Sequence, residues 1–294
     1  MKNLSPAARP SSFSLRAPAK INWFLTILGK RKDGYHNIIS LMQCISLYDK
    51  LSFKKADSLV ISSDLDIPVE INLVHKAASL FKKYTSCNDG AKITLQKNIP
   101  VSAGLGGGSS DAAYTLLGLN ILWSIGLNNR ELSTIGRKIG SDVPFFLNSS
   151  FALVEGRGER VVPLKHNKSA IVLLLVKPGM SVSTAWAYEY FDKIYTDKLT
   201  KKPVDIKLFC QALSKRDFTS LSTFLSNDLE KVVIEKYPVV GKIKERLLEN
   251  GALISSMTGS GPTVFGVFES KKTALAAAYR MGADNWYGVA ETIV

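Results

Sequence analysis

Four glycines lie within five positions of one segment, Gly104 to Gly108, and they constrain this chain more than any other feature. Glycine lets a backbone approach an anion closely and adopt the positive φ angles at which successive N–H groups converge. The next residues, Ser109, Ser110 and Asp111, are typical of a helix start, and apolar residues follow at helical spacing. A helix N-terminus carries about half a positive charge and several unpaired N–H donors. The segment therefore predicts a phosphate-binding loop.

The spacing of the glycines excludes the two commonest loops of this kind. The Walker A pattern requires a lysine after the glycines, and none lies between Gly104 and Ser110. The dinucleotide fingerprint requires a glycine where Ser109 stands. A flexible linker is the remaining alternative, but linkers rarely lead straight into an amphipathic helix. The pattern indicates a nucleotide or phosphate site of neither common type.

Length and composition indicate a globular protein, and the order of the predicted helices and strands indicates the α+β class. The chain has 294 residues, of which 46% are hydrophobic and 21% charged, which is ordinary for a soluble protein. We expect two domains, residues 1–160 and 161–294. The longest apolar run, Ala170 to Val176, is far too short to span a bilayer. Met1 to Ser12 lacks the apolar core of a signal peptide and is expected to be a disordered arm. Hydrophobic periodicity and turn residues predict four local elements. They are a strand over Ser12–Leu28, two short strands within Ile38–Phe53, a helix over Asn72–Tyr84 and a hairpin over Phe151–Val154 and Gly158–Pro163. Because the predicted helices and strands alternate without a strict βαβ period, we expect the α+β class.

Charge and cysteine content indicate the cellular compartment of the protein and the kind of partner that it binds. The chain has three cysteines far apart and three scattered histidines, which favours a reducing cytoplasm and predicts no structural zinc. The net charge of +13 fits either nucleic-acid binding or phosphorylated substrates. Because the basic residues are spread along the chain without a recognition motif, we expect a small-molecule substrate, with neither nucleic acid nor membrane as a partner. We also expect a monomer or a weak homodimer.

Three segments resemble the GHMP kinases, the small-molecule kinases that include galactokinase, homoserine kinase and mevalonate kinase. They are Ala17–Asn22 (APAKIN), Pro100–Ser110 (PVSAGLGGGSS) and Gly259–Thr263 (GSGPT). The resemblance implies an N-terminal domain like domain 2 of ribosomal protein S5 and a ferredoxin-like C-terminal domain. It also implies ATP as the phosphoryl donor, with Mg²⁺.

Two further segments narrow the substrate. Asp33–His36 (DGYH) and Ser141–Phe146 (SDVPFF) resemble the GHMP kinases that act on 4-diphosphocytidyl-2-C-methyl-D-erythritol. That implies transfer of phosphate from ATP to the 2-hydroxyl of this cytidine diphosphate-linked alcohol, in the non-mevalonate pathway of isoprenoid biosynthesis. The alternatives are another GHMP kinase, of the homoserine or mevalonate type, and a basic RNA-binding module.

The same resemblance implies two catalytic residues, Asp142 and Lys20. Asp142 lies two residues before Pro144, which favours an extended backbone at Val143, and would accept the hydroxyl proton. A turn-capping aspartate is the other interpretation. Lys20 would lie near Asp142, keep it ionised and stabilise the transferring phosphoryl group; a solvated strand lysine is its alternative.

Nucleotide and substrate contacts follow from the matched motifs. The resemblance implies that ATP is bound by Pro100, Val101, Ser102, Ala103, Gly104, Leu105, Gly106, Gly107, Gly108, Ser109, Ser110 and, near the adenine, Asn72. Asn72 is equally suited to cap a helix, and Ser102 stands where many family members have glycine. The substrate would contact Asn22, Tyr35, His36, Thr184, Tyr188, Gly259 and Ser260. Here the two tyrosines would stack on the cytosine and His36 would bond its edge; ordinary half-buried side chains are the alternative.

Overall fold

The computed structural model describes residues 10–65, 68–165, 169–195 and 204–294. The predicted N-terminal arm lies largely outside these ranges, and so does His166. The chain forms two compact units. The first contains residues up to Ala17 with Tyr48–Asn98 and Gly107–Leu147, and the second contains Pro18–Leu47, Ile99–Gly106 and Asn148–Val294. The expected mixture of helices and strands is confirmed, whereas a domain boundary at residue 160 stays a prediction.

Two long paired strands, β1 (Ser12–Lys30) and β2 (His36–Ala56), contribute residues to both units. The strand predicted from Ser12 is confirmed as β1. The prediction of two short strands between Ile38 and Phe53 is wrong, because β2 continues through its polar residues without a break. Asp49 does not interrupt the strand, since its carboxylate is buried against Lys97.

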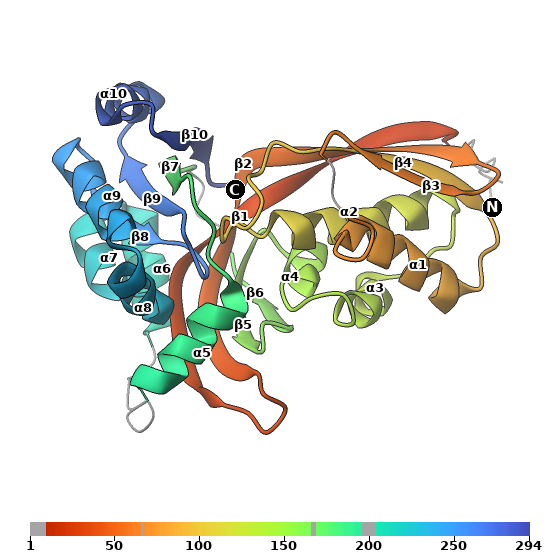
Figure 1. Cartoon of the computed structure of the whole chain (residues 1–294), viewed down its shortest axis with the longest axis horizontal. Helices are drawn as coiled ribbons and strands as arrows, with labels where there is room; N and C mark the ends of the chain where they lie inside the picture. The colour runs from red at the N-terminus through yellow and green to blue at the C-terminus, as the bar shows by residue number, and fades with distance from the viewer. Residues whose placement is uncertain (1–9, 66–67, 166–168, 196–203) are drawn as a thin grey trace, which may run out of the picture. The chain divides into compact units, whose positions relative to one another are not determined.

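In the first unit, helices pack on one side of a small sheet (Figure 1). The helices are α1 (Leu73–Thr85), α2 (Gly107–Leu122), α3 (Asn129–Gly136) and α4 (Val143–Asn148). The C-terminal half of β2 pairs antiparallel with β4 (Gly90–Gln96), which pairs in parallel with β3 (Leu59–Ser63). Helix α2 lies close to the sheet because Gly118 has no side chain: a Cβ there would lie 2.2 Å from the ring of Phe53.

Two local predictions in this unit need correction. Helix α2 begins at Gly107, before the Ser109–Asp111 segment that the sequence marks as its start, because glycine also adopts helical angles. Val143 is the first residue of α4, so its backbone is helical and not extended as predicted. The first N–H groups of a helix have no partner within it, so proline, which lacks an N–H, is tolerated in the first turn. The helix therefore accommodates Pro144.

The second unit contains an antiparallel sheet in the order β10-β7-β9-β8 and a hairpin that pairs with the N-terminal half of β2. The sheet strands are β7 (Val172–Pro178), β8 (Ile254–Met257), β9 (Val264–Phe268) and β10 (Asn285–Glu291). The hairpin strands are β5 (Phe151–Gly156) and β6 (Arg160–Pro163). The predicted hairpin is therefore confirmed, whereas the sequence patterns do not predict β10, which is mostly half-buried and alternates weakly.

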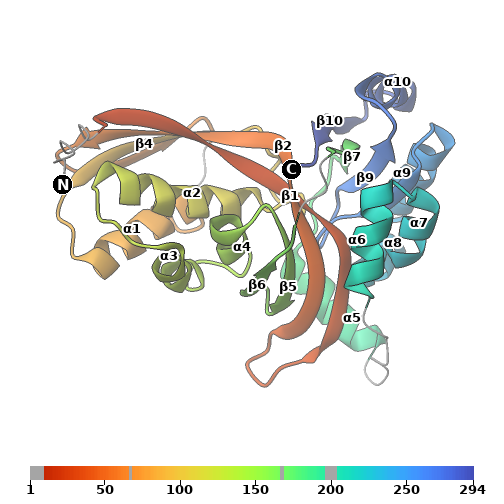
Figure 2. The same cartoon turned by 180° about the vertical axis from the view of Figure 1, so that it is seen from behind.

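The described part of this unit also contains helices α5 to α10, which Figure 2 labels. They are α5 (Thr184–Ile194), α6 (Ile206–Lys215), α7 (Phe218–Phe224), α8 (Asp228–Lys236), α9 (Pro238–Glu249) and α10 (Lys271–Met281). Leu174 of β7 belongs to the same apolar cluster as residues of α9 and α10, while Leu173 belongs to the cluster that contains residues of α6. Alternation along the strand thus buries both faces of the sheet. None of the helices in the described ranges is long and apolar enough to cross a membrane.

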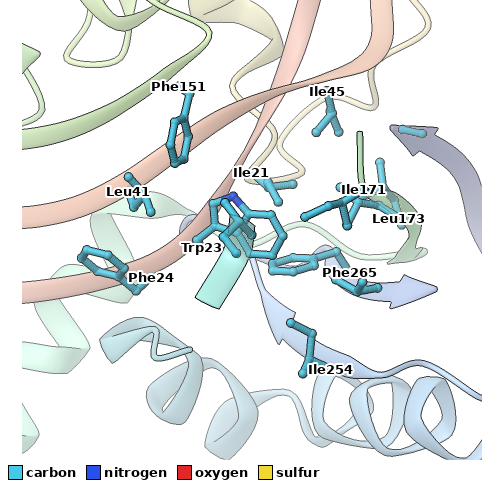
Figure 3. Close-up of a cluster of buried hydrophobic side chains, with 14 of the residues drawn as sticks. Ile21, Trp23, Phe24, Leu41, Ile45, Phe151, Ile171, Leu173, Ile254 and Phe265 are labelled. Atoms are coloured by element: carbon cyan, nitrogen blue, oxygen red, sulfur yellow. The ribbon is translucent and has the colours of Figure 1, made fainter. Parts of the chain in front are cut away.

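A cluster of aromatic and aliphatic side chains in the second unit fixes the middle of β1 (Figure 3). Trp23 is fully buried, with its ring centroid 5.7 Å from that of Phe265, and its indole nitrogen donates to Gln43 at 2.7 Å. Side chains alternate along a strand, so Ile21 and Trp23 enter the cluster while Lys20 and Asn22 point to the opposite face. The core therefore orients these two polar residues.

Three buried charged residues join the strands and helices of the first unit. Lys97 donates to Asp111 at 2.8 Å and also contacts Asp49. The three side chains are at most 5% exposed. Burial raises the pKa of Asp111 to about 7, although the positive charge of Lys97 acts in the opposite direction.

Asp111→Asn is expected to weaken the pH dependence of stability. The folded-state pKa of Asp111 lies above its unfolded value, so ionising it costs folding free energy as pH rises from about 4 to about 7, and the penalty persists above that. Lys97 and Asp49 are the charged groups that face it. Between about pH 5 and about pH 8 the wild type should lose more thermal stability than Asp111→Asn. Thermal melts measure this, with the exposed Asp57 changed to Asn as control; equal pH dependence in wild type and Asp111→Asn would contradict the prediction.

Candidate active site

The glycine-rich segment forms a tight loop with several left-handed residues. Gly104 has φ 74° and Gly106 has φ 71°, and Ser102 also has a positive φ, 52°. Serine rarely adopts this conformation, which explains why glycine suits position 102. A Cβ on Gly104 would lie 2.3 Å from the carbonyl oxygen of Thr258. Gly104 is therefore required both by its φ angle and by the backbone packed against it.

A second loop, Thr258–Thr263, braces the first. Gly259, with φ 59°, packs so tightly that a Cβ there would lie 2.8 Å from the carbonyl oxygen of Gly104 and 3.2 Å from Lys20 Nζ. Asn227 holds this loop, because its amide donates to the carbonyl oxygens of Met257 and Gly259 at 2.9 and 2.8 Å. The two glycine segments that the sequence places far apart are thus in backbone contact.

Lys20 lies against both loops and is 3% exposed. Its ammonium donates to Asn22 Oδ1 at 2.6 Å and to the carbonyl oxygen of Gly104 at 3.0 Å. Its backbone N–H donates to Leu105 at 2.9 Å. A cation desolvated and held in this way interacts strongly with a nearby anion, so this environment suits phosphate chemistry.

Asn22 is committed to a buried network that orients Lys20. Its Nδ2 donates to Ser40 Oγ at 2.7 Å, and that hydroxyl donates to the carbonyl oxygen of Phe24 at 2.6 Å. Its backbone N–H donates to Thr258 Oγ1 at 3.0 Å. Asn22 is 2% exposed, so its side chain fixes the lysine on one side and the Thr258 loop on the other.

The predicted phosphate-binding residues divide by their burial. Ala103, Leu105 and Ser110 are buried. The exposed members are Val101, Ser102 and Gly108, and the intermediate ones are Pro100, Gly104, Gly106, Gly107 and Ser109. The buried side chains of Ala103 and Leu105 attach the loop to the core, while its four glycines are half-buried or exposed. The Ser110 hydroxyl is buried without a hydrogen-bond partner among the described residues, so its hydrogen-bonding capacity is unused there.

Asn72 and Asp142 each precede a helix of the first unit. The side-chain oxygen of Asn72 caps α1, accepting from Val74 at 3.0 Å and His75 at 3.4 Å. Its capping interpretation is therefore confirmed, and a contact with adenine stays a prediction. Asp142 is half-buried immediately before α4, and its carbonyl oxygen accepts from Phe145 at 3.2 Å.

Two of the three predicted cytosine-binding residues, His36 and Tyr188, contact each other in the second unit. His36 Nε2 lies 2.6 Å from Asp192 Oδ1, and the His36 ring stacks on Tyr188 with centroids 4.8 Å apart. Burial acts to raise the pKa of Asp192, but hydrogen bonds from Lys30 and His36 prevail and lower it. Tyr35 is half-exposed, with the guanidinium carbon of Arg157 4.7 Å from its ring centroid. His36, Tyr188 and Asp192 thus form one cluster (the His36 cluster), whereas the ring of Tyr35 contacts Arg157.

Thr184 and Ser260, both predicted substrate contacts, are brought together by the fold. Their hydroxyls lie 2.7 Å apart, which ties the start of α5 to the Gly259 loop. Sequence reasoning missed Asp192, although it lies four residues after Tyr188 on α5 and so shares its helix face. It also missed Asn227 and Ser40, for which no local pattern gives a signal.

No group of three or more His, Cys, Asp and Glu able to hold a metal occurs within the described ranges. A Mg²⁺ ion in a kinase usually takes most of its ligands from phosphates and water, with one or two from the protein. The unpartnered Ser110 hydroxyl is consistent with that kind of site.

Comparison with known proteins identifies the family. The model of the GHMP kinases N terminal domain matches residues 72–150, and that of the GHMP kinases C terminal domain matches residues 209–288. The chain is similar to a crystal structure of 4-(cytidine 5'-diphospho)-2C-methyl-D-erythritol kinase, with a TM-score of 0.78 and 30% identity over 95% of this chain and 99% of that one. Mevalonate kinase of L. major shares the fold alone, with a TM-score of 0.73 and 16% identity over 98% of each chain.

Curated relatives of the same kinase family are similar to this chain over almost its whole length. The 4-diphosphocytidyl-2-C-methyl-D-erythritol kinase of Thermodesulfovibrio yellowstonii is 47% identical over 95% of this chain and 97% of its own. The enzyme of the same name from Caldanaerobacter subterraneus is 41% identical over 95% and 96%. These matches confirm the expected α+β kinase fold and favour it over an RNA-binding module. The chain belongs to the GHMP kinases and, within them, to the 4-diphosphocytidyl-2-C-methyl-D-erythritol kinase family.

Proposed function

We propose that this protein transfers the terminal phosphoryl group of ATP to the 2-hydroxyl of 4-diphosphocytidyl-2-C-methyl-D-erythritol, a step of non-mevalonate isoprenoid biosynthesis. The products are ADP and the 2-phosphate of the alcohol. Similarity over nearly the full length to relatives of that name carries the proposal. The buried lysine against a glycine loop supports the phosphoryl-transfer half, and the His36 cluster supports the cytidine half.

The ATP phosphates bind to the backbone of residues 100–110, and Asn72 lies near the adenine. Gly106 is bonded directly to Gly107, so the loop ends in the N-terminus of α2, whose N–H groups and dipole attract anions. The buried Ser110 hydroxyl would be a protein ligand of Mg²⁺. When bound, that ion would neutralise part of the charge on the β- and γ-phosphates.

Lys20 and Asp142 perform the chemistry. Phosphoryl transfer has a loose transition state, so the protein chiefly positions groups and stabilises charge. Lys20 supplies a desolvated cation held by Asn22 and Gly104, and this cation stabilises negative charge on the transferring group. Asp142 accepts the proton that the substrate hydroxyl releases.

The cytidine end is recognised by the aromatic cluster. Tyr35 and Tyr188 supply faces on which the pyrimidine stacks, and His36, held by Asp192, bonds its edge. Asn22, Thr184, Gly259 and Ser260 lie along the alcohol end. We further propose that the protein is a cytoplasmic monomer or weak homodimer that does not bind nucleic acid. Size-exclusion chromatography tests the oligomeric state. RNA-binding titrations at several salt concentrations test for nucleic-acid binding.

A coupled assay of ADP release tests the function. Turnover is expected with 4-diphosphocytidyl-2-C-methyl-D-erythritol and Mg²⁺-ATP, and cytidine nucleotides should compete with the alcohol. Homoserine and mevalonate should give no turnover above background. Turnover with either of them and none with the cytidyl substrate would replace the proposal by another GHMP kinase activity.

Asp142→Asn should lower kcat by about 10²- to 10⁴-fold, the usual contribution of a general base. ATP binding should survive, because an amide of the same size keeps the turn before α4. Asp205→Asn is the matched control: Asp205 caps α6 by accepting from Lys207 and Leu208, and asparagine caps equally well. Steady-state kinetics of both variants decide, and an unchanged kcat in Asp142→Asn would remove Asp142 from the catalytic step.

His36→Ala should raise KM for the cytidyl substrate about tenfold while leaving KM for ATP within about twofold. A tenfold rise in KM corresponds to loss of the hydrogen bond from His36 to the cytosine and of the ring that stacks on Tyr188. Separate titrations of the two substrates measure this split. A selective rise in KM for ATP would assign the His36 cluster to the nucleotide instead.

A further inference from the structure

The buried charges of Asp49, Lys97 and Asp111 have no role in the chemistry proposed above. The ammonium of Lys97 contacts the carboxylates of both Asp49 and Asp111 in the first unit. Asp111 Oδ1 has no hydrogen-bond partner among the described residues. Two carboxylates thus share one lysine in an environment almost without solvent.

These residues lie at the two ends of the phosphate loop. Lys97 comes three residues before Pro100, and Asp111 directly follows Ser110. The Lys97–Asp111 ion pair therefore closes the loop at its base. Asp49 attaches this base to β2, because its Oδ1 accepts the backbone N–H of Asn98 at 2.6 Å while its Oδ2 contacts Lys97.

Stability is a weak explanation for such a group. Burying charges costs desolvation free energy, and replacing a buried ion pair by neutral residues is often neutral or stabilising. The loop, however, contains four glycines within five positions, and glycine loses the most conformational freedom on ordering. Fixed ends lower the entropy cost of holding its N–H groups at the spacing of a phosphate, in addition to the contacts that Gly104 and Leu105 make with the rest of the protein.

Charge gives a second reason for the lysine. Asp111 lies one helical turn after Gly107, the first residue of α2. A carboxylate there would oppose the attraction of the helix N-terminus for an anion. The ammonium of Lys97, 2.8 Å from Asp111 Oδ2, offsets this repulsion.

We infer that Asp49, Lys97 and Asp111 are positioning residues that clamp the ends of the phosphate loop and thereby set the affinity for the phosphates of ATP. The inference rests on the proposed role of residues 100–110 in ATP binding. It requires no contact between the three residues and the nucleotide.

Two variants separate positioning from stability. Lys97→Met leaves two carboxylates without their cation, and it should lower Tm and weaken ATP binding at least about tenfold. The triple variant Asp49→Asn, Lys97→Met and Asp111→Asn buries no charge and keeps the acceptor for Asn98. We expect it to recover most of the wild-type Tm but not the ATP affinity. Calorimetric titration with ATP in the absence of the alcohol measures affinity, and thermal melts measure Tm.

Lys271→Met is the control for loss of an ion pair, because Lys271 pairs with Glu291 at 2.8 Å in the second unit. It should leave the Kd for ATP unchanged, whatever its effect on Tm. KM for the cytidyl substrate should stay within about twofold in every variant that folds. If Lys97→Met does not fold, the triple variant carries the test alone.

The outcomes are distinct. Wild-type ATP affinity in a stable triple variant would overturn the inference and leave a structural role for the three residues. Weakened ATP binding in Lys271→Met to the same extent would also overturn it, since any lost ion pair would then suffice. Absence of ATP binding by the wild type would overturn the proposed function together with the inference.

Discussion

Direct backbone contact between two loops is the constraint on which the second unit's polar site depends. Gly104 and Gly259 approach so closely that a methyl group on either would overlap carbonyl oxygens of the other loop. Lys20 fits against this contact and uses the carbonyl oxygen of Gly104 as an acceptor. Because the positions of both backbones and of the ammonium depend on one another, substitution at either glycine displaces all three.

Buried polar groups in the protein are fixed in chains of contacts. Lys20 is held by Asn22, Asn22 by Ser40 and Thr258, and the Thr258 loop by Asn227. A buried polar group without partners costs free energy, so these networks have few alternative arrangements. Among the described residues, the buried hydroxyls of Ser110, Ser255 and Thr263 lie outside these chains of contacts, because none of them has a hydrogen-bond partner.

Local patterns predicted much of the fold and failed at specific places. The strand from Ser12, the helix after Asn72 and the β5–β6 hairpin follow from periodicity and capping residues. The break expected in β2 failed because burial against Lys97 makes Asp49 compatible with a strand. Residues such as Asn227, which supports a loop thirty positions away, carry no local signal, because side-chain contacts across such distances depend on packing.

The sequence alone determined the glycine-rich loop, the α+β class and, through its short motifs, the kinase family, since backbone conformation and helix dipoles depend on a few neighbouring residues. Only the tertiary structure decided which residues support those motifs. It brought Thr258 against Gly104, Asp192 against His36, and Lys97 between two carboxylates. Distances between segments far apart in the chain arise from the packing of the core, and that packing is a property of all the residues together.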